Sequence, residues 1–79
     1  MRVRLLYFAS LRDAAGCDED KLDAASMSLA QLYENARIRH GFAFPQERLR
    51  VARNGAFAYW NEVIVDGDEI AFIPPVSGG

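Results

Sequence analysis

The chain has 79 residues, of which 51% are apolar, and this length has room for one hydrophobic core and therefore one domain. A formal net charge of −2 excludes the overall basic field that attracts nucleic acid or an anionic membrane. The single cysteine, Cys17, has no partner for an internal disulfide, and we expect a cytoplasmic protein. The first apolar run is also far shorter than the roughly 18–20 residues of a membrane span.

The first predicted element is a strand, because residues 2–8 alternate between two faces. Phe8 falls on the face opposite to the one that we expect to be buried. Residues 21–23 predict a short second strand that returns antiparallel to the first. The residues predicted for the buried face of the first strand are Val3, Leu5 and Tyr7.

Two helices are predicted from their capping residues. Ser10 is a suitable N-cap for a short helix that runs to Ala15. The main helix has a stronger signal, because Ser28 and Gln31 have the spacing of a capping box and Gly41 suits a left-handed C-terminal position. Five residues with helical spacing predict its buried face: Leu29, Leu32, Tyr33, Ala36 and His40.

Three further strands are predicted after the main helix. Residues 48–52 alternate, the Asn54-Gly55 pair favours a tight turn, and residues 57–60 predict a short or irregular strand. Residues 69–73 form the last strand, with Ile70 and Phe72 on one face. The order β-β-α-β-β-β, with a helical crossover, allows the first and last strands to pair in parallel in the middle of the sheet. The sequence therefore predicts an α+β protein of the β-grasp type, a mixed sheet packed on one main helix.

The side chains offer no catalytic machinery. With one cysteine and one histidine, a Cys/His metal site is not expected, and His40 is explained as a cation or a partly buried ring at a helix end. The acids of residues 66–69 are explained by turn formation rather than by metal binding. Five arginines in residues 37–53 form a basic block, which is either a solvated face or a docking surface for an acidic partner.

The C-terminal residues have a chemical interpretation. Pro74 and Pro75 lack a backbone N–H, so they end the last strand and direct the chain outward in a stiff form. Gly78 and Gly79 have no side chain, which leaves the terminal carbonyl open to attack. A carboxylate must first be activated, for example as a mixed anhydride with AMP, which a sulfur donor can convert to a thiocarboxylate. The alternative is a frayed and inert chain end.

Two segments carry a resemblance to a known family. The sequence YFASLRD at residues 7–13 and the sequence DGDEIAFIPPVSGG at residues 66–79, with Asn54 between them, resemble the small subunits of molybdopterin synthase, the MoaD-type sulfur carriers. The resemblance implies a ubiquitin-like β-grasp domain over residues 1–75 and a flexible tail over residues 76–79. It also implies that an E1-like enzyme uses ATP to adenylate Gly79, and that a thiocarboxylate then forms there.

The resemblance also implies partners. The tail would enter the large synthase subunit of a heterotetramer, where the catalytic side chains are expected and where sulfur passes to cyclic pyranopterin monophosphate to build the dithiolene of molybdopterin. A sulfur donor protein would load the tail, and no cofactor would be bound permanently. Arg12 has an alternative role, since it can pair with Asp13 or a helix end. The implied partner contacts are Phe8, Arg12, Phe57, Ile73, Pro74, Pro75, Val76 and Ser77.

Three other functions share parts of this pattern. A sulfur carrier for the thiamine thiazole would use the same Gly-Gly chemistry, but its match to residues 66–75 is weaker. A protein modifier would be attached to lysines through Gly79. A β-grasp interaction module with an inert tail would not need Gly79 at all.

Overall fold

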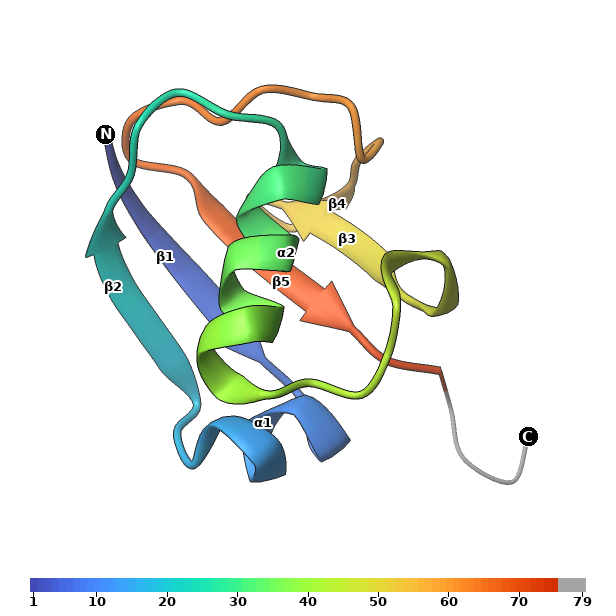
Figure 1. The fold of residues 1–79 in the computed structure, drawn as a ribbon. Coiled ribbons are helices and arrows are strands. Elements are labelled where there is room, and N and C mark those ends of the chain that lie inside the picture. Colours follow the sequence, from blue (N-terminus) through green and yellow to red (C-terminus); the bar gives the residue numbers. More distant parts are fainter. Residues whose placement is uncertain (76–79) are drawn as a thin grey trace.

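The computed structural model describes residues 1–75, so the predictions for Val76, Ser77, Gly78 and Gly79 lie outside the described residues. The described chain forms a sheet with two helices (Figure 1). Its elements are β1 (Arg2–Tyr7), α1 (Ala9–Ala15), β2 (Glu19–Asp23), α2 (Leu29–His40), the 3₁₀ turn η1 (Gln46–Arg48), β3 (Arg50–Arg53), β4 (Ala56–Phe57) and β5 (Glu69–Ile73).

The sheet has the strand order β2-β1-β5-β3-β4. β1 and β5 are parallel neighbours, and the other pairs are antiparallel. The last strand is therefore central and hydrogen-bonded on both sides. The crossover that allows this parallel pair contains α2, which lies across one face of the sheet (Figure 1). The predicted β-grasp arrangement is confirmed.

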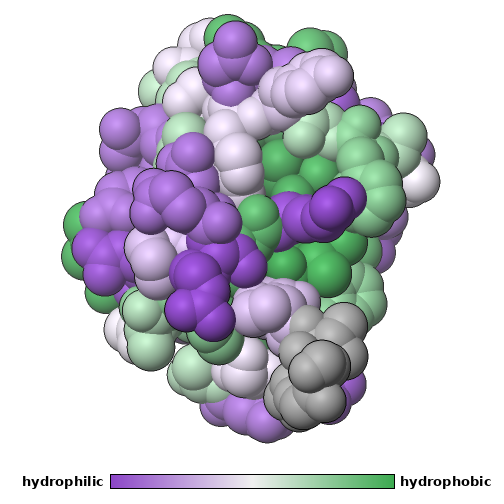
Figure 2. Space-filling model, turned by 90° about the vertical axis from the view of Figure 1, so that its right-hand side faces the viewer, coloured by the Kyte–Doolittle hydropathy of each residue, from purple (hydrophilic) through white to green (hydrophobic). Residues whose placement is uncertain are grey.

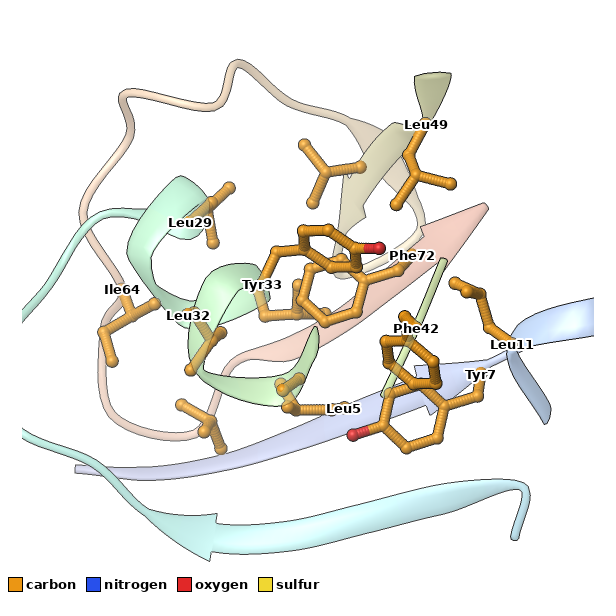
Figure 3. Packing of buried hydrophobic residues seen from close by; sticks show 14 residues of the cluster. Leu5, Tyr7, Leu11, Leu29, Leu32, Tyr33, Phe42, Leu49, Ile64 and Phe72 are labelled. Carbon is orange, nitrogen blue, oxygen red and sulfur yellow. The ribbon is translucent and has the colours of Figure 1, made fainter. Parts of the chain in front are cut away.

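One aromatic-rich core joins α2 to the inner face of the sheet (Figure 3). The ring of Phe72 meets that of Tyr33 edge to face, with centroids 5.0 Å apart, and stacks on that of Trp60 at 6.2 Å. The predicted alternation of β1 and β5 is confirmed. The core consists of Val3, Leu5, Tyr7, Leu11, Leu29, Leu32, Tyr33, Ala36, Phe42, Leu49, Val51, Ile64, Ile70 and Phe72.

The ends of α2 follow from local chemistry. The Ser28 hydroxyl accepts a hydrogen bond from the Gln31 N–H at 3.1 Å, as the capping prediction requires. Gly41 ends the helix with φ +73°, a conformation that an L side chain adopts only with strain. The reciprocal hydrogen bond from the Ser28 N–H to the Gln31 side chain is absent among the described residues, and the Gln31 amide N–H donates to Asn35 at 2.9 Å.

Two local predictions are wrong. The N-cap of α1 is the extended residue Phe8, and no side chain caps this helix, so Ser10 lies within the helix rather than before it. The strand predicted over residues 57–60 ends at Phe57. The following loop instead offers the carbonyls of Trp60 and Glu62 to the first N–H groups of α2, at 3.0 and 2.8 Å, which are groups that a helix cannot satisfy internally.

Candidate functional site

The site begins with the strand that carries the chain toward its C-terminus. β5 is hydrogen-bonded to β1 on one side and β3 on the other, and it continues into Pro74, which is buried, and Pro75, which is exposed. Neither proline can donate to a neighbouring strand, so the ladder ends here. The stalk that leads to the predicted reactive terminus is therefore attached to the central strand of the sheet.

The outer face of the sheet carries exposed apolar side chains beside this stalk. Phe8 is 45% exposed and Phe57 is 69% exposed. Ile73 is half-buried on the same face, since its neighbour Phe72 points inward. The structure thus brings together the three large apolar residues predicted as partner contacts. The face predicted for Phe8 and Ile73 is confirmed.

Strand register adds three smaller residues to this surface. Leu6 is opposite Ala71, Ala71 is opposite Ala52, and Ala52 is opposite Phe57, so four neighbouring strands contribute to one row. The period-two alternation of β1 predicts that Leu6 faces outward, but only the register shows that these residues lie side by side. We call the complete surface the outer stripe, and it consists of Leu6, Phe8, Ala52, Phe57, Ala71 and Ile73.

Arg12 has a structural neighbour other than the expected one. It lies in the last turn of α1, and its Nε is 4.0 Å from a carboxylate oxygen of Asp18. The side chain of Arg12 is half-exposed, and the Asp18 carboxylate is highly exposed. Such a pair adds little stability in water, so Arg12 remains available to a partner.

The turn before β5 is built around a buried carboxylate. Asp68 accepts hydrogen bonds from Arg53 Nε at 2.9 Å, from the Asn54 amide at 3.1 Å and from the Val65 N–H at 2.8 Å. Burial alone would raise the pKa of Asp68, but these hydrogen bonds outweigh burial and hold that pKa below its ordinary value. Arg53 also pairs with Glu62 at 2.9 Å. The acids of this turn therefore organise the backbone, as expected.

A second carboxylate joins α2 to the antiparallel strand pair β1 and β2. Asp20 Oδ2 accepts a hydrogen bond from the Tyr7 hydroxyl and lies 2.6 Å from Nε2 of His40. Burial would raise the pKa of Asp20, but the bonds from Tyr7 and His40 lower it below its ordinary value. Burial and the bond to Asp20 raise the pKa of Tyr7. The prediction of a partly buried His40 ring is confirmed, because the ring packs against Tyr7 and Phe42 at 5.3 and 5.4 Å.

Within residues 1–75, no helix is long and apolar enough to cross a bilayer. The same residues contain no group of three or more His, Cys, Asp or Glu side chains that could hold a metal ion.

Together, the fold and the stalk define a class of protein. A mixed β-grasp sheet packed on one main helix, with a central last strand that runs into two prolines, is the ubiquitin-like arrangement. The chain belongs to the ThiS family, whose model matches residues 5–79.

Curated relatives extend over the whole chain. The chain is 30% identical to the molybdopterin synthase sulfur carrier subunit of Escherichia coli over 98% of its own length and 99% of the relative's. It is 32% identical to the subunit of that name from Mycobacterium tuberculosis, over 100% and 99% of the two chains. Among solved structures, SAMP1 from Haloferax volcanii matches with a TM-score of 0.84 and 27% identity, and each chain is covered completely. These relatives are small sulfur carriers and modifiers of similar length.

Proposed function

We propose that this chain is the sulfur-carrier subunit of a molybdopterin synthase. The observation that carries the proposal is the continuation of the central strand β5 through Pro74 and Pro75 into a sequence that ends with Gly78-Gly79, beside the outer stripe. The full-length similarity to curated sulfur carrier subunits supports it. In this proposal, residues 1–75 are the single domain and residues 76–79 are the tail that carries the reacting group.

The chemistry takes place at the carboxylate of Gly79. An E1-like enzyme would join a carboxylate oxygen to the α-phosphate of ATP and release pyrophosphate. The persulfide of a sulfur donor protein would then displace AMP to give an acyl disulfide, and a thiol of the donor system would cleave its S–S bond, which leaves the thiocarboxylate on Gly79 and a disulfide on the donor. Its sulfur is anionic at neutral pH and nucleophilic, and attachment to the chain presents it at high effective concentration within the partner's site. A cytoplasmic setting suits these ATP-dependent steps.

The partner of the loaded carrier would be the large synthase subunit, with two small subunits flanking a dimer of large ones. There, sulfur would pass to cyclic pyranopterin monophosphate, and the large subunit would supply the catalytic side chains. Phe8, Phe57 and Ile73 would form the apolar contact with this partner, because exposed apolar groups gathered on one face favour a protein interface. Arg12 would contact the large subunit at the edge of this apolar surface. Pro74 and Pro75 of the stalk, with Val76 and Ser77, would also contact the large subunit, between the outer stripe and the reaction site.

The direct test is thiocarboxylate formation. The purified chain, incubated with its adenylating enzyme, ATP and a sulfur source, should increase in intact mass by the difference between sulfur and oxygen. A variant lacking Gly79 should show no such change, and it should fail to restore cofactor synthesis in a strain without its own small subunit. Restoration by the truncated variant would contradict the proposal and would favour an interaction module with an inert tail. Restoration of thiamine synthesis alone would favour the thiazole pathway.

A second candidate function is protein modification. The similarity to SAMP1, one of the archaeal modifier proteins, favours it. In this case, Gly79 would form an isopeptide bond with a lysine of another protein. Recovery of the Gly79 end in isopeptide linkage from cells would support modification, whereas its recovery only as carboxylate or thiocarboxylate would support the sulfur carrier.

A further inference from the structure

The structure divides the basic block of residues 37–53 into two groups. Three of its five arginines lie within 4.0 Å of carboxylates of the described chain, which neutralise them: Arg37 with Glu34, Arg39 with Asp20, and Arg53 with Glu62 and Asp68. Arg48 and Arg50 form no ion pair within residues 1–75. Instead, the guanidinium carbon of Arg48 lies 5.7 Å from the centre of the Phe44 ring, and that of Arg50 lies 5.4 Å from the centre of the Phe57 ring.

Arg50 lies on the rim of an apolar groove at the β3–β4 edge of the sheet. The groove has a volume of about 300 Å³. Figure 2, which looks at the right-hand side of Figure 1, shows hydrophobic surface gathered on this side of the molecule, with a strongly hydrophilic side chain across it. Besides Arg50, the lining residues are Leu49, Val51, Phe57, Ala58, Tyr59 and Trp60.

The groove is continuous with the outer stripe. Phe57 belongs to both surfaces, and Arg50 is the cross-strand neighbour of Ile73 at the end of β5. Tyr59, on the groove, is 80% exposed. One partner that covers the outer stripe beside the stalk can therefore also reach the groove.

The electrostatics of Arg50 suit an incoming carboxylate. A guanidinium that lies over an aromatic ring keeps its in-plane N–H groups free, and these groups match the two oxygens of a carboxylate. The apolar groove beside it lowers the local dielectric constant, which strengthens the attraction. By contrast, the larger hollow beside β1 and β2, of about 480 Å³, is lined by both signs of charge, among them Arg2, Lys21 and Asp23.

We propose that Arg48, Arg50 and the groove form a second docking area for the large synthase subunit. The matching surface of the large subunit would carry an apolar side chain that enters the groove and carboxylates around it that pair with the two arginines. This inference rests on the proposed function. The choice of partner follows from continuity, because Phe57 belongs to both surfaces, Arg50 pairs with Ile73, and the proposed function assigns the outer stripe to the large subunit. The outer stripe offers six residues, and the groove extends it without a gap.

The test compares two single charge reversals, Arg50→Glu and Lys21→Glu, which change the net charge equally, and adds a double variant and a neutral one. Arg50→Glu should weaken binding to the purified large subunit by at least about fivefold, and the Arg48→Glu/Arg50→Glu variant by about 20-fold or more. Lys21→Glu, at the other end of the sheet, should stay within about twofold. Tyr59→Ala should weaken binding about fivefold through the lost groove wall. Calorimetric titration at low and high salt measures these values, and the double variant should lose most of the salt dependence of the wild type.

Three results would overturn the proposal. The first is unchanged binding of the double variant, and the second is equal weakening by Arg50→Glu and Lys21→Glu, which would indicate a general effect of net charge. The third is weaker binding to the adenylating enzyme but not to the large subunit. Thermal melts verify the fold of each variant. Thiocarboxylate yield separates the two proposals, since the double variant should still be loaded at Gly79, whereas a wild-type chain that is never loaded would contradict the proposed function itself.

Discussion

The two faces of the same sheet have opposite properties. On the inner face, Leu5, Ile70 and Phe72 are completely buried beneath α2. On the outer face, Phe8 and Phe57 leave about half or more of their surface in water. Because side chains alternate along a strand, adjacent residues of β5 lie on opposite faces of the sheet and have different roles. Burial on one side stabilises the domain, and exposure on the other leaves apolar surface for a partner.

The charged groups follow the same division. Arg53 and Asp68 are shielded from water, with side chains 20% and 7% exposed. Arg4, on the outer face, pairs with Glu19 and Glu69 while about half of its side chain remains exposed. A buried pair is costly to break, whereas an exposed pair contributes little. Substitutions on the inner side should therefore change stability, and those on the outer side should change binding.

Phe72→Ala should have the largest effect on stability. The substitution leaves a cavity between Tyr33 and Trp60, and it should lower the free energy of unfolding by about 3–5 kcal/mol. This is a large part of the 5–15 kcal/mol that is typical of a domain. Urea denaturation followed by circular dichroism measures the change. A loss below about 1 kcal/mol would show that the inner face does not hold the fold together.

Asp68→Ala should cost about 2–4 kcal/mol, because it leaves the shielded guanidinium of Arg53 without its buried carboxylate and removes the acceptor of the Val65 N–H. Asp18→Ala is the matched control. The Asp18 carboxylate is exposed and 4.0 Å from Arg12, so its removal should change stability by less than about 0.5 kcal/mol. Equal losses in the two urea titrations would contradict the distinction between buried and exposed pairs.

The same carboxylate should make the protein sensitive to acid. The pKa of Asp68 is lower in the folded state than its ordinary value, so the unfolded chain binds the proton more readily. The contribution of Asp68 is therefore complete above an ordinary carboxyl pKa of about 3.9 and is lost as the pH falls through its folded pKa. Urea midpoints between neutral and acid pH should fall less steeply in Asp68→Ala than in the wild type. Identical slopes would remove Asp68 as a source of acid sensitivity.

Much of the fold could be predicted because its signals are local. The alternation of residues 69–73 predicts the bounds of β5, and Ser28 and Gly41 predict the two ends of α2. In each case, neighbouring residues determine the backbone, through period-two burial or a cap. The parallel pairing of the first and last strands could also be predicted, because a long helical connection suits a parallel strand pair.

Other features depend on residues far apart in the chain. The loop after Phe57 leaves the extended form because its carbonyls at Trp60 and Glu62 satisfy the start of α2, which lies 30 or more positions earlier. No local pattern carries this information. Likewise, the sequence showed a basic block, but only the structure separates Arg53, which is paired internally, from Arg50, which lies over Phe57.

Phe57→Ala should weaken binding without weakening the fold. The side chain is mostly exposed, so stability should change by less than about 0.5 kcal/mol. Loss of an aromatic anchor in the outer stripe should weaken binding to the large subunit by about 1–3 kcal/mol. Val65→Ala, an exposed apolar residue outside this stripe, should bind like the wild type. Titration calorimetry of the wild type and the two variants with the large subunit measures the difference in binding. Equal weakening by Phe57→Ala and Val65→Ala would mean that the outer stripe is not the specific contact.

Arg4→Ala should have the smallest effect, although Arg4 forms two ion pairs across three strands. Its Nε and Nη1 lie 2.9 Å from Glu19 and 3.1 Å from Glu69, but both partners are more than one-third exposed. Water already solvates these charges well, so the urea-derived free energy of unfolding should fall by only about 0.5 kcal/mol or less. A loss of stability as large as that of Asp68→Ala would mean that ion pairs on the outer face also stabilise the fold. The distinction between a stabilising inner face and a binding outer face would then be wrong.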